Sequence, residues 1–153
     1  MASEIIPDKR LLLELVRDRL QAAVIAAKQA MDASQEAANS EGKSSMGDKY
    51  ETGRAMAQID RDMYAQRYDQ LKGELEALDR ITAGDSSSAR LGSLVKTSLG
   101  YVLLAVSMGV VETDWGKVLV VSTQSPLGRA VLGRQAGDVF VFQGKGHKLS
   151  AVL

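Results

Sequence analysis

Residues 8–39 contain neither glycine nor proline, and this uninterrupted run constrains the fold more than any other feature of the sequence. The run is rich in leucine, alanine, glutamate, glutamine, lysine and arginine, which are strong helix formers. We therefore predict one long helix from Pro7 to about Asn39. Its apolar residues recur at spacings of three and four, as in the seam of a coiled coil. The predicted seam positions are Leu13, Val16, Leu20, Ala23, Ala27 and Ala30, continued by Ser34 and Ala37.

A second helix of similar length is expected behind a turn. Residues 39–47 are small and polar and include two glycines, which predicts a tip. The second helix should run from about Asp48 to Thr82 and fold back antiparallel on the first. Its seam is predicted to consist of two sets of apolar residues, each at spacings of three and four. The second set is shifted by one residue relative to the first. The first set is Met56, Ile59 and Met63, and the second is Tyr64, Tyr68, Leu71, Leu75 and Leu78.

An intramolecular hairpin is the simplest arrangement that covers these two narrow apolar stripes. Only two long helices are predicted, their other faces are heavily charged, and one stripe buries little area. We therefore expect a monomer, with a compact bundle and a dimeric coiled coil as the alternatives.

The pattern changes to short apolar runs after residue 90, which predicts a small antiparallel β domain. A short helix should interrupt the strands, because Ser125 suits the N-cap, Pro126 suits the first helical position and Gly133 suits a helix end. This helix is expected to cover one face of the sheet with Leu127, Val131 and Leu132. The predicted strands are 93–97, 101–106, 110–112, 117–121, 139–142 and 147–153.

The sequence therefore predicts an α+β fold in two parts. Residues 1–83 form the antiparallel coiled-coil hairpin, residues 84–90 form a small polar linker, and residues 91–153 form the β domain with its one short helix.

Composition excludes several classes of function. Positive and negative residues balance at 19 each, so no broad attraction to nucleic acid and no direct sequence-specific DNA binding are expected. The chain has no cysteine and a single histidine, His147, which argues against thiol catalysis, a Ser-His-Asp triad and a metal site of its own. We therefore expect no enzyme. No signal sequence and no membrane span are recognisable, which predicts a cytoplasmic protein without a membrane partner.

The segment 122–138 contains Ser-Pro-Leu-Gly-Arg-Ala-Val-Leu-Gly at 125–133 and Gly-Asp at 137–138. This segment resembles a signature of the bacterial Gre transcript-cleavage factors. The order of hairpin, polar joint and β domain agrees with that family. The resemblance implies an FKBP-like C-terminal domain and a transcription elongation regulator that binds bacterial RNA polymerase through the secondary channel. In the family the short helix and its preceding loop dock at the channel rim, which implies docking contacts at Ser125, Pro126, Leu127 and Arg129.

The tip of the hairpin departs from the family. Gre factors place two acids there, which help the polymerase hold a second Mg²⁺ for transcript cleavage. When Tyr50 is aligned with the family tyrosine, the two acidic positions fall on Lys43 and Met46, and neither side chain ligates Mg²⁺. The resemblance therefore predicts polymerase binding and leaves cleavage open, with Mg²⁺ shared with the polymerase as the only candidate cofactor. The candidate tip contacts are Glu41, Lys43, Asp48, Tyr50 and Glu51.

Two alternatives stay open at this point. Helix capping and solvation account for the tip acids as well as ion binding does. A peptidyl-prolyl isomerase or chaperone that uses the FKBP-like domain is the alternative function, and it requires an apolar pocket lined by aromatic residues. The β domain offers for this only Tyr101, Trp115, Phe140 and Phe142, with both phenylalanines on one strand face, where they are available mainly to the core.

Overall fold

The structure, a computed structural model, describes residues 6–41, 47–81 and 86–153, and of Glu41 and residues 47–51 it describes the backbone alone. These residues form two compact units. The hairpin unit is Val16–Ala77, and the sheet unit comprises the chain up to Leu15 and from Leu78 to Leu153. None of the described helices combines the length and the apolar character that crossing a bilayer requires.

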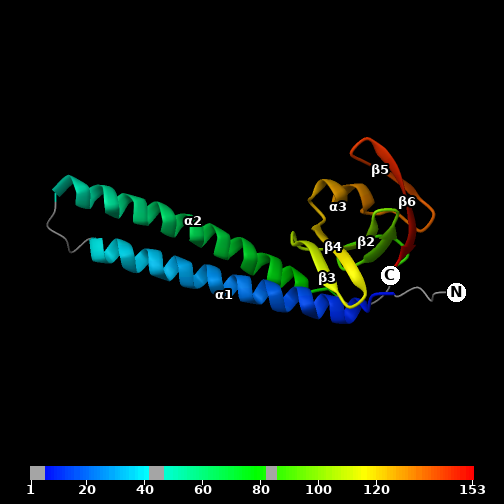
Figure 1. The fold of residues 1–153 in the computed structure, drawn as a ribbon, viewed down its shortest axis with the longest axis horizontal. Coiled ribbons are helices and arrows are strands. Elements are labelled where there is room, and N and C mark those ends of the chain that lie inside the picture. Colours follow the sequence, from blue (N-terminus) through cyan, green and yellow to red (C-terminus); the bar gives the residue numbers. More distant parts are fainter. Residues whose placement is uncertain (1–5, 42–46, 82–85) are drawn as a thin grey trace. The chain divides into compact units, whose positions relative to one another are not determined.

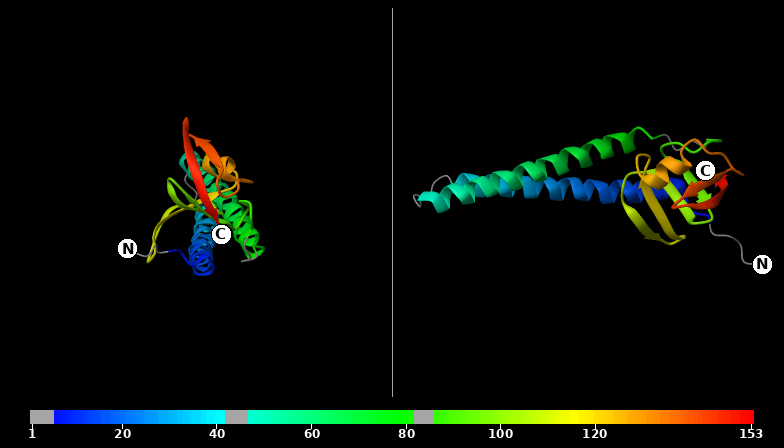
Figure 2. Two further views of the ribbon diagram at one scale, coloured as in Figure 1. Left: turned by 90° about the vertical axis from the view of Figure 1, so that its right-hand side faces the viewer. Right: turned by 90° about the horizontal axis from the view of Figure 1, so that it is seen from above.

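Two long helices confirm the predicted hairpin. Helix α1 (Lys9–Glu41) and helix α2 (Gly47–Asp79) each contain 33 residues, which corresponds to about 50 Å of helix. Within the hairpin unit they run side by side in opposite directions (Figure 1 and Figure 2). Helix α1 begins slightly later than predicted because Asp8 is its cap. The Asp8 carboxylate accepts a hydrogen bond from the N–H of Leu11 at 3.2 Å.

The buried face of α1 follows the predicted positions in the middle of the helix and differs from them at both ends. At the start, Leu12 is fully buried and the predicted Leu13 is half-buried. Val16, Leu20 and Ala27 are buried as predicted. Farther along, Ala37 is exposed and its neighbour Ala38 is buried instead. A straight helix turns by 3.6 residues, so a strict repeat of 3.5 rotates away from the seam by ~20° per heptad. Four predicted positions are half-buried, namely Leu13, Ala23, Ala30 and Ser34.

Of the two sets of seam residues predicted for α2, the second is confirmed and the first is wrong. Tyr64, Tyr68, Leu71, Leu75 and Leu78 are buried or half-buried. The side chains of Met56, Ile59 and Met63 are 62%, 66% and 55% exposed. Toward the start of α2 the seam continues at spacings of four and three residues, so the predicted slip of one residue does not occur. The seam residues there are half-buried, namely Gly53, Ala57 and Arg61.

The described residues of the sheet unit contain all six predicted strands in the spatial order β3-β4-β2-β1-β6-β5. The predicted α+β class is thereby confirmed. The elements are β1 (Leu94–Thr97), β2 (Gly100–Ala105), β3 (Gly109–Thr113), β4 (Gly116–Ser122), helix α3 (Pro126–Val131), β5 (Val139–Phe142) and β6 (Lys145–Val152).

The sheet is mixed and not antiparallel throughout, because β2 and β4 pair in parallel. Strand β3 takes the outer position, and β4 returns between β3 and β2. Burial accounts for this order. Val118 and Val120 of β4 are fully buried, whereas Val110 and Glu112 of β3 are exposed, and the more apolar strand occupies the interior of the sheet.

Helix α3 covers one face of the sheet, as predicted, but with two of the three expected side chains. Leu127 and Val131 pack into a core that Phe140 joins from β5. Leu132 is 45% exposed, because the helix ends at Val131 and the extended backbone of Leu132 turns its side chain outward. The other buried members of this core are Ala89, Val95, Val102, Leu104 and Leu149.

The last residues of the predicted linker are bonded to the sheet unit. The N–H of Ala89 donates to the oxygen of Arg134 at 2.8 Å, and the N–H of Gly133 donates to the oxygen of Ala89 at 2.7 Å. Ser88 forms an isolated bridge with Gln135. The segment that enters the sheet is therefore attached to the end of α3.

Candidate partner-binding surface

The start of α3 is determined by Ser125. Its backbone is extended, and its side-chain oxygen accepts a hydrogen bond from the N–H of Gly128 at 3.0 Å. The same hydroxyl donates to the backbone oxygen of Ser122 at 2.7 Å. Pro126 follows at the beginning of the helix, where its missing N–H costs nothing. The predicted cap is thus confirmed, and it also connects α3 with the end of β4.

Gly128 brings the two backbones into direct contact. A Cβ atom at this position would lie 2.0 Å from the backbone oxygen of Ser122, so no other residue fits without a shift of the helix. Helix α3 is therefore held against the end of β4 by its backbone as well as by the Ser125 hydroxyl. The residues that α3 presents to the outside have a rigid support.

Two of the four predicted docking residues present their side chains at the surface. Pro126 and Arg129 are exposed. Leu127 is only 4% exposed and packs in the core, so its side chain is not at the surface, and its predicted docking contact stays untested. Ser125 is half-buried, and its hydroxyl is already used within the fold. The motif therefore contains both a structural part and an exposed part.

Further exposed residues lie near the end of α3. Leu132 is three residues after Arg129, and Arg134 follows the helix end. The backbone bonds of Ala89 bring Arg90, which is exposed, to the same region. We call Arg90, Arg129, Leu132 and Arg134 the arginine surface. The position of Leu132 directly before the helix-ending glycine is a partial signal in the sequence. No sequence signal exists for Arg90, which reaches this region through the backbone bonds of Ala89.

The arginine surface is suited to an acidic partner. Within the described residues no salt bridge involves any of its three arginines. Arg134 makes one weak side-chain hydrogen bond within the described residues, from its Nε to the backbone oxygen of Ala130 at 3.4 Å. Guanidinium groups bind carboxylates through paired hydrogen bonds, and arginine beside an exposed leucine is a common composition for a protein interface.

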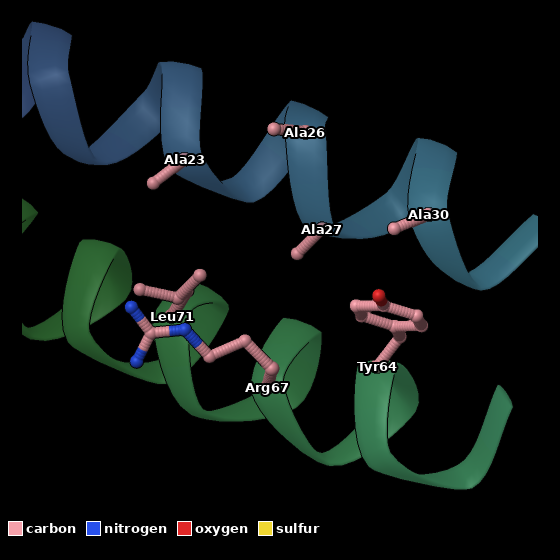
Figure 3. A pocket seen from close by; sticks show the side chains of 7 residues that line it. All are labelled: Ala23, Ala26, Ala27, Ala30, Tyr64, Arg67 and Leu71. Carbon is pink, nitrogen blue, oxygen red and sulfur yellow. The ribbon is translucent and has the colours of Figure 1, made fainter. Parts of the chain in front are cut away.

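The hairpin unit contains an open apolar groove of about 290 Å³ between its helices (Figure 3). It forms because small side chains of α1 face larger ones of α2. Arg67 is its only charged residue, and no carboxylate or imidazole lines it. We interpret it as a packing groove. Its lining residues are Ala23, Ala26, Ala27 and Ala30 of α1 and Tyr64, Arg67 and Leu71 of α2.

Next to this groove, burial raises the pKa of the half-buried Glu74 carboxyl above its usual value. The positive charge of Arg67 and a hydrogen bond with Gln70 oppose the shift without cancelling it. At neutral pH the charged Glu74 carboxylate therefore lowers the stability of the hairpin unit.

The structure does not test the predicted tip contacts. Lys43 and Met46 lie outside the described residues. The backbone of Glu41 is at the end of α1, and Asp48, Tyr50 and Glu51 are in the first turns of α2, but their side chains also lie outside the described part. Elsewhere in the described chain, no three acidic or histidine side chains gather in a metal-binding cluster.

The aromatic residues of the sheet unit do not line one pocket. Phe140 is fully buried in the core beneath α3. Tyr101 alternates along β2 with Val102, a member of that core, and therefore lies on the other face of the sheet. Trp115 is in the turn between β3 and β4. This arrangement offers no support for the isomerase alternative.

Solved structures of Gre factor homologues are similar to the chain over most of its length. GreA factor homolog 1 (Gfh1) of Thermus thermophilus has 21% sequence identity and a TM-score of 0.37, covering 90% of this chain and 94% of that chain. Another structure of the transcription factor Gfh1 has 20% identity and a TM-score of 0.36, with 89% and 92% covered. Gfh1 of Thermus aquaticus has 20% identity and a TM-score of 0.34, with 88% and 92% covered. No family model and no curated protein matches the chain.

Proposed function

We propose that the chain is a Gre-type regulator of transcription elongation that binds bacterial RNA polymerase. In this proposal the exposed side of α3 docks at the rim of the secondary channel, and the turn between α1 and α2 enters the channel. The observation that carries the proposal is the Ser125 cap. The Ser-Pro segment that resembles the Gre signature forms a short helix fixed on a sheet, in a chain that also contains two paired helices of 33 residues.

The chemistry of the arginine surface supports this docking. Its three arginines and Leu132 suit an acidic protein surface with an apolar centre. The sequence of the tip supports binding without catalysis, because lysine and methionine stand where the resemblance places the Mg²⁺-binding acids. The regulator therefore acts by occupying the channel and has no enzymatic activity of its own.

Binding can be measured by surface plasmon resonance with immobilised bacterial core RNA polymerase. We expect the pair Arg129→Glu and Arg134→Glu to weaken binding by about tenfold or more, because each change replaces an attractive charge with a repulsive one. The control is Lys117→Glu, an exposed charge reversal on β4, which is compared with each of the single variants Arg129→Glu and Arg134→Glu. Equal binding by the wild type, the double variant and the control would contradict docking through α3.

The part played by the tip is tested separately, by deletion of residues 40–55. We expect the deleted protein to keep the fold of its sheet unit, as monitored by Trp115 fluorescence, and to lose its effect on transcription. A deleted protein that regulates transcription as the full chain does would rule out insertion of the tip.

Transcript cleavage is measured on stalled elongation complexes with radiolabelled RNA. We expect the wild-type chain to add no cleavage to that of the polymerase alone. The variant Asp48→Ala with Glu51→Ala is expected to behave in the same way. Cleavage that appears with the wild type and disappears with this variant would show that these two acids replace the family pair.

A further inference from the structure

Strand β5 is an edge strand of the sheet. The strand order ends with β5, whose only strand partner among the described residues is β6 (Figure 1). The two strands are joined by Gln143 and Gly144, which both have positive φ angles, 53° and 77°, as in a type I′ hairpin turn. This turn fixes which backbone groups of β5 point toward β6.

The backbone of Val139 and Val141 points away from β6. In a two-residue hairpin the residues next to the turn, Phe142 and Lys145, exchange hydrogen bonds, and bonded pairs then alternate along the ladder. The N–H of Leu149 donates to the backbone oxygen of Asp138 at 2.9 Å, as this alternation of bonded and non-bonded pairs requires. Within the described residues, no backbone hydrogen bond outside the ladder involves Val139 or Val141.

The side chains of these two residues are also accessible. Val139 is 60% and Val141 is 66% exposed, on the face opposite to Phe140 and Phe142. Natural edge strands are commonly protected by proline, by a charged residue or by a bulge. Strand β5, with the sequence Val-Phe-Val-Phe, has none of the three. Its outer edge is therefore a regular template for another strand.

The charge beside this edge is positive. Lys148 is paired with Val139 and Lys145 with Phe142, and both lysines are exposed. No salt bridge within the described residues involves either lysine, and neither strand contains an acidic residue. A strand added to β5 would lie about 10 Å from β6, within reach of the two lysine side chains. Asp138, just before β5, accepts a bond from the N–H of Gln135 at 2.8 Å.

We propose that the outer edge of β5 binds an extended acidic segment of another protein, which adds to the sheet as a further strand. The backbone of Val139 and Val141 supplies the hydrogen bonds, and the two valine side chains supply apolar contact. Lys148, on the face of the valines, and Lys145, on the opposite face, select acidic residues. A second copy of this chain fits the edge less well. Self-pairing would bring the like charges of Lys145 and Lys148 together with those of the second copy. This site and the arginine surface have no residue in common.

The test uses the full chain labelled with ¹⁵N and a short capped peptide that repeats Glu-Glu-Val-Val, which presents glutamates on both faces of an added strand. We expect the peptide to shift the amide signals of residues 138–142 in a saturable manner. The same peptide with lysine in place of glutamate should bind about threefold or more weakly. Val141→Pro removes one outward N–H without removing a ladder bond, and it should weaken binding about fivefold or more.

Two controls make the result independent of folding. Val141→Thr keeps the N–H and the branched side chain and should bind as the wild type does. A peptide N-methylated at alternate residues carries the same charge and leaves the protein unchanged, and it should not bind. Absence of binding by the acidic peptide, equal binding of the N-methylated peptide, or shifts in other regions only would overturn the proposal. Concentration-dependent shifts of residues 138–142 without peptide would assign the edge to a second copy instead.

Discussion

The hydroxyl of Ser125 donates to the backbone oxygen of Ser122 at 2.7 Å and also accepts a hydrogen bond from the N–H of Gly128 at 3.0 Å. One small side chain therefore connects the end of β4 with the first turn of α3. Because α3 supplies two buried side chains to the core and also carries Arg129, this connection links the stability of the sheet unit to the shape of its candidate docking surface.

Replacement of Ser125 by alanine should lower the free energy of unfolding of the sheet unit by about 1–2 kcal/mol, since it removes a helix cap and leaves the Ser122 oxygen without its side-chain donor. Urea unfolding followed by the fluorescence of Trp115, the only tryptophan, measures this effect. Ser87→Ala, at an exposed serine of the same unit, is the matched control. Identical unfolding midpoints for the two variants would show that the Ser125 hydroxyl contributes no stability.

Two glycine-to-alanine changes should have opposite effects. Gly128→Ala places a methyl group 2.0 Å from the Ser122 oxygen, so α3 must move, and we expect a loss of about 2–4 kcal/mol. Gly73→Ala meets nothing within 4 Å in the middle of α2 and should stabilise the helix by up to about 1 kcal/mol. Trp115 fluorescence follows the first variant and circular dichroism at 222 nm the second. A Gly128→Ala protein as stable as the wild type would mean that α3 is not closely packed on β4.

The elements of this fold were predictable because each has a local signal. The run without glycine or proline predicted α1, the alternation of short apolar runs predicted the strands, and Ser125 with Pro126 predicted α3. The parallel pairing of β2 with β4 was not predictable, because it depends on which strand is buried after the chain has folded. Local patterns do not specify the order of strands in a sheet.

The candidate surface was predictable only in part. Pro126 and Arg129 were identified through the motif, but the same motif includes Leu127, whose role is in the core. A resemblance transfers a whole segment and does not separate its buried side chains from its exposed ones. Arg90 was missed because the backbone hydrogen bonds of Ala89 bring it to the end of α3, and no sequence pattern predicts these bonds.

The corrected seam of α2 gives a third prediction. Leu71→Ala should lower the free energy of unfolding of the hairpin unit by about 2–3 kcal/mol, because Leu71 is buried against α1. Ile59→Ala should leave it within about 0.5 kcal/mol of the wild type, because Ile59 is exposed and alanine is the better helix former. Urea unfolding followed at 222 nm compares them. A cost at Ile59 equal to that at Leu71 would place Ile59 in a packed interface, as a dimeric coiled coil requires.

The raised pKa of Glu74 predicts how the stability of the hairpin unit depends on pH. Because burial raises the folded-state pKa above the unfolded-state value, the folded chain holds more protons between the two values. The contribution of Glu74 to the free energy of unfolding should therefore fall as pH rises through that window, which begins near the usual pKa of a glutamate. Glu74→Gln should raise the unfolding midpoint at pH 7 and have little effect below pH 4. Glu76→Gln, at an exposed position on the same helix, corrects for the change in net charge. If the two variants respond alike at both pH values, burial of the Glu74 carboxylate is not what limits the stability of this unit.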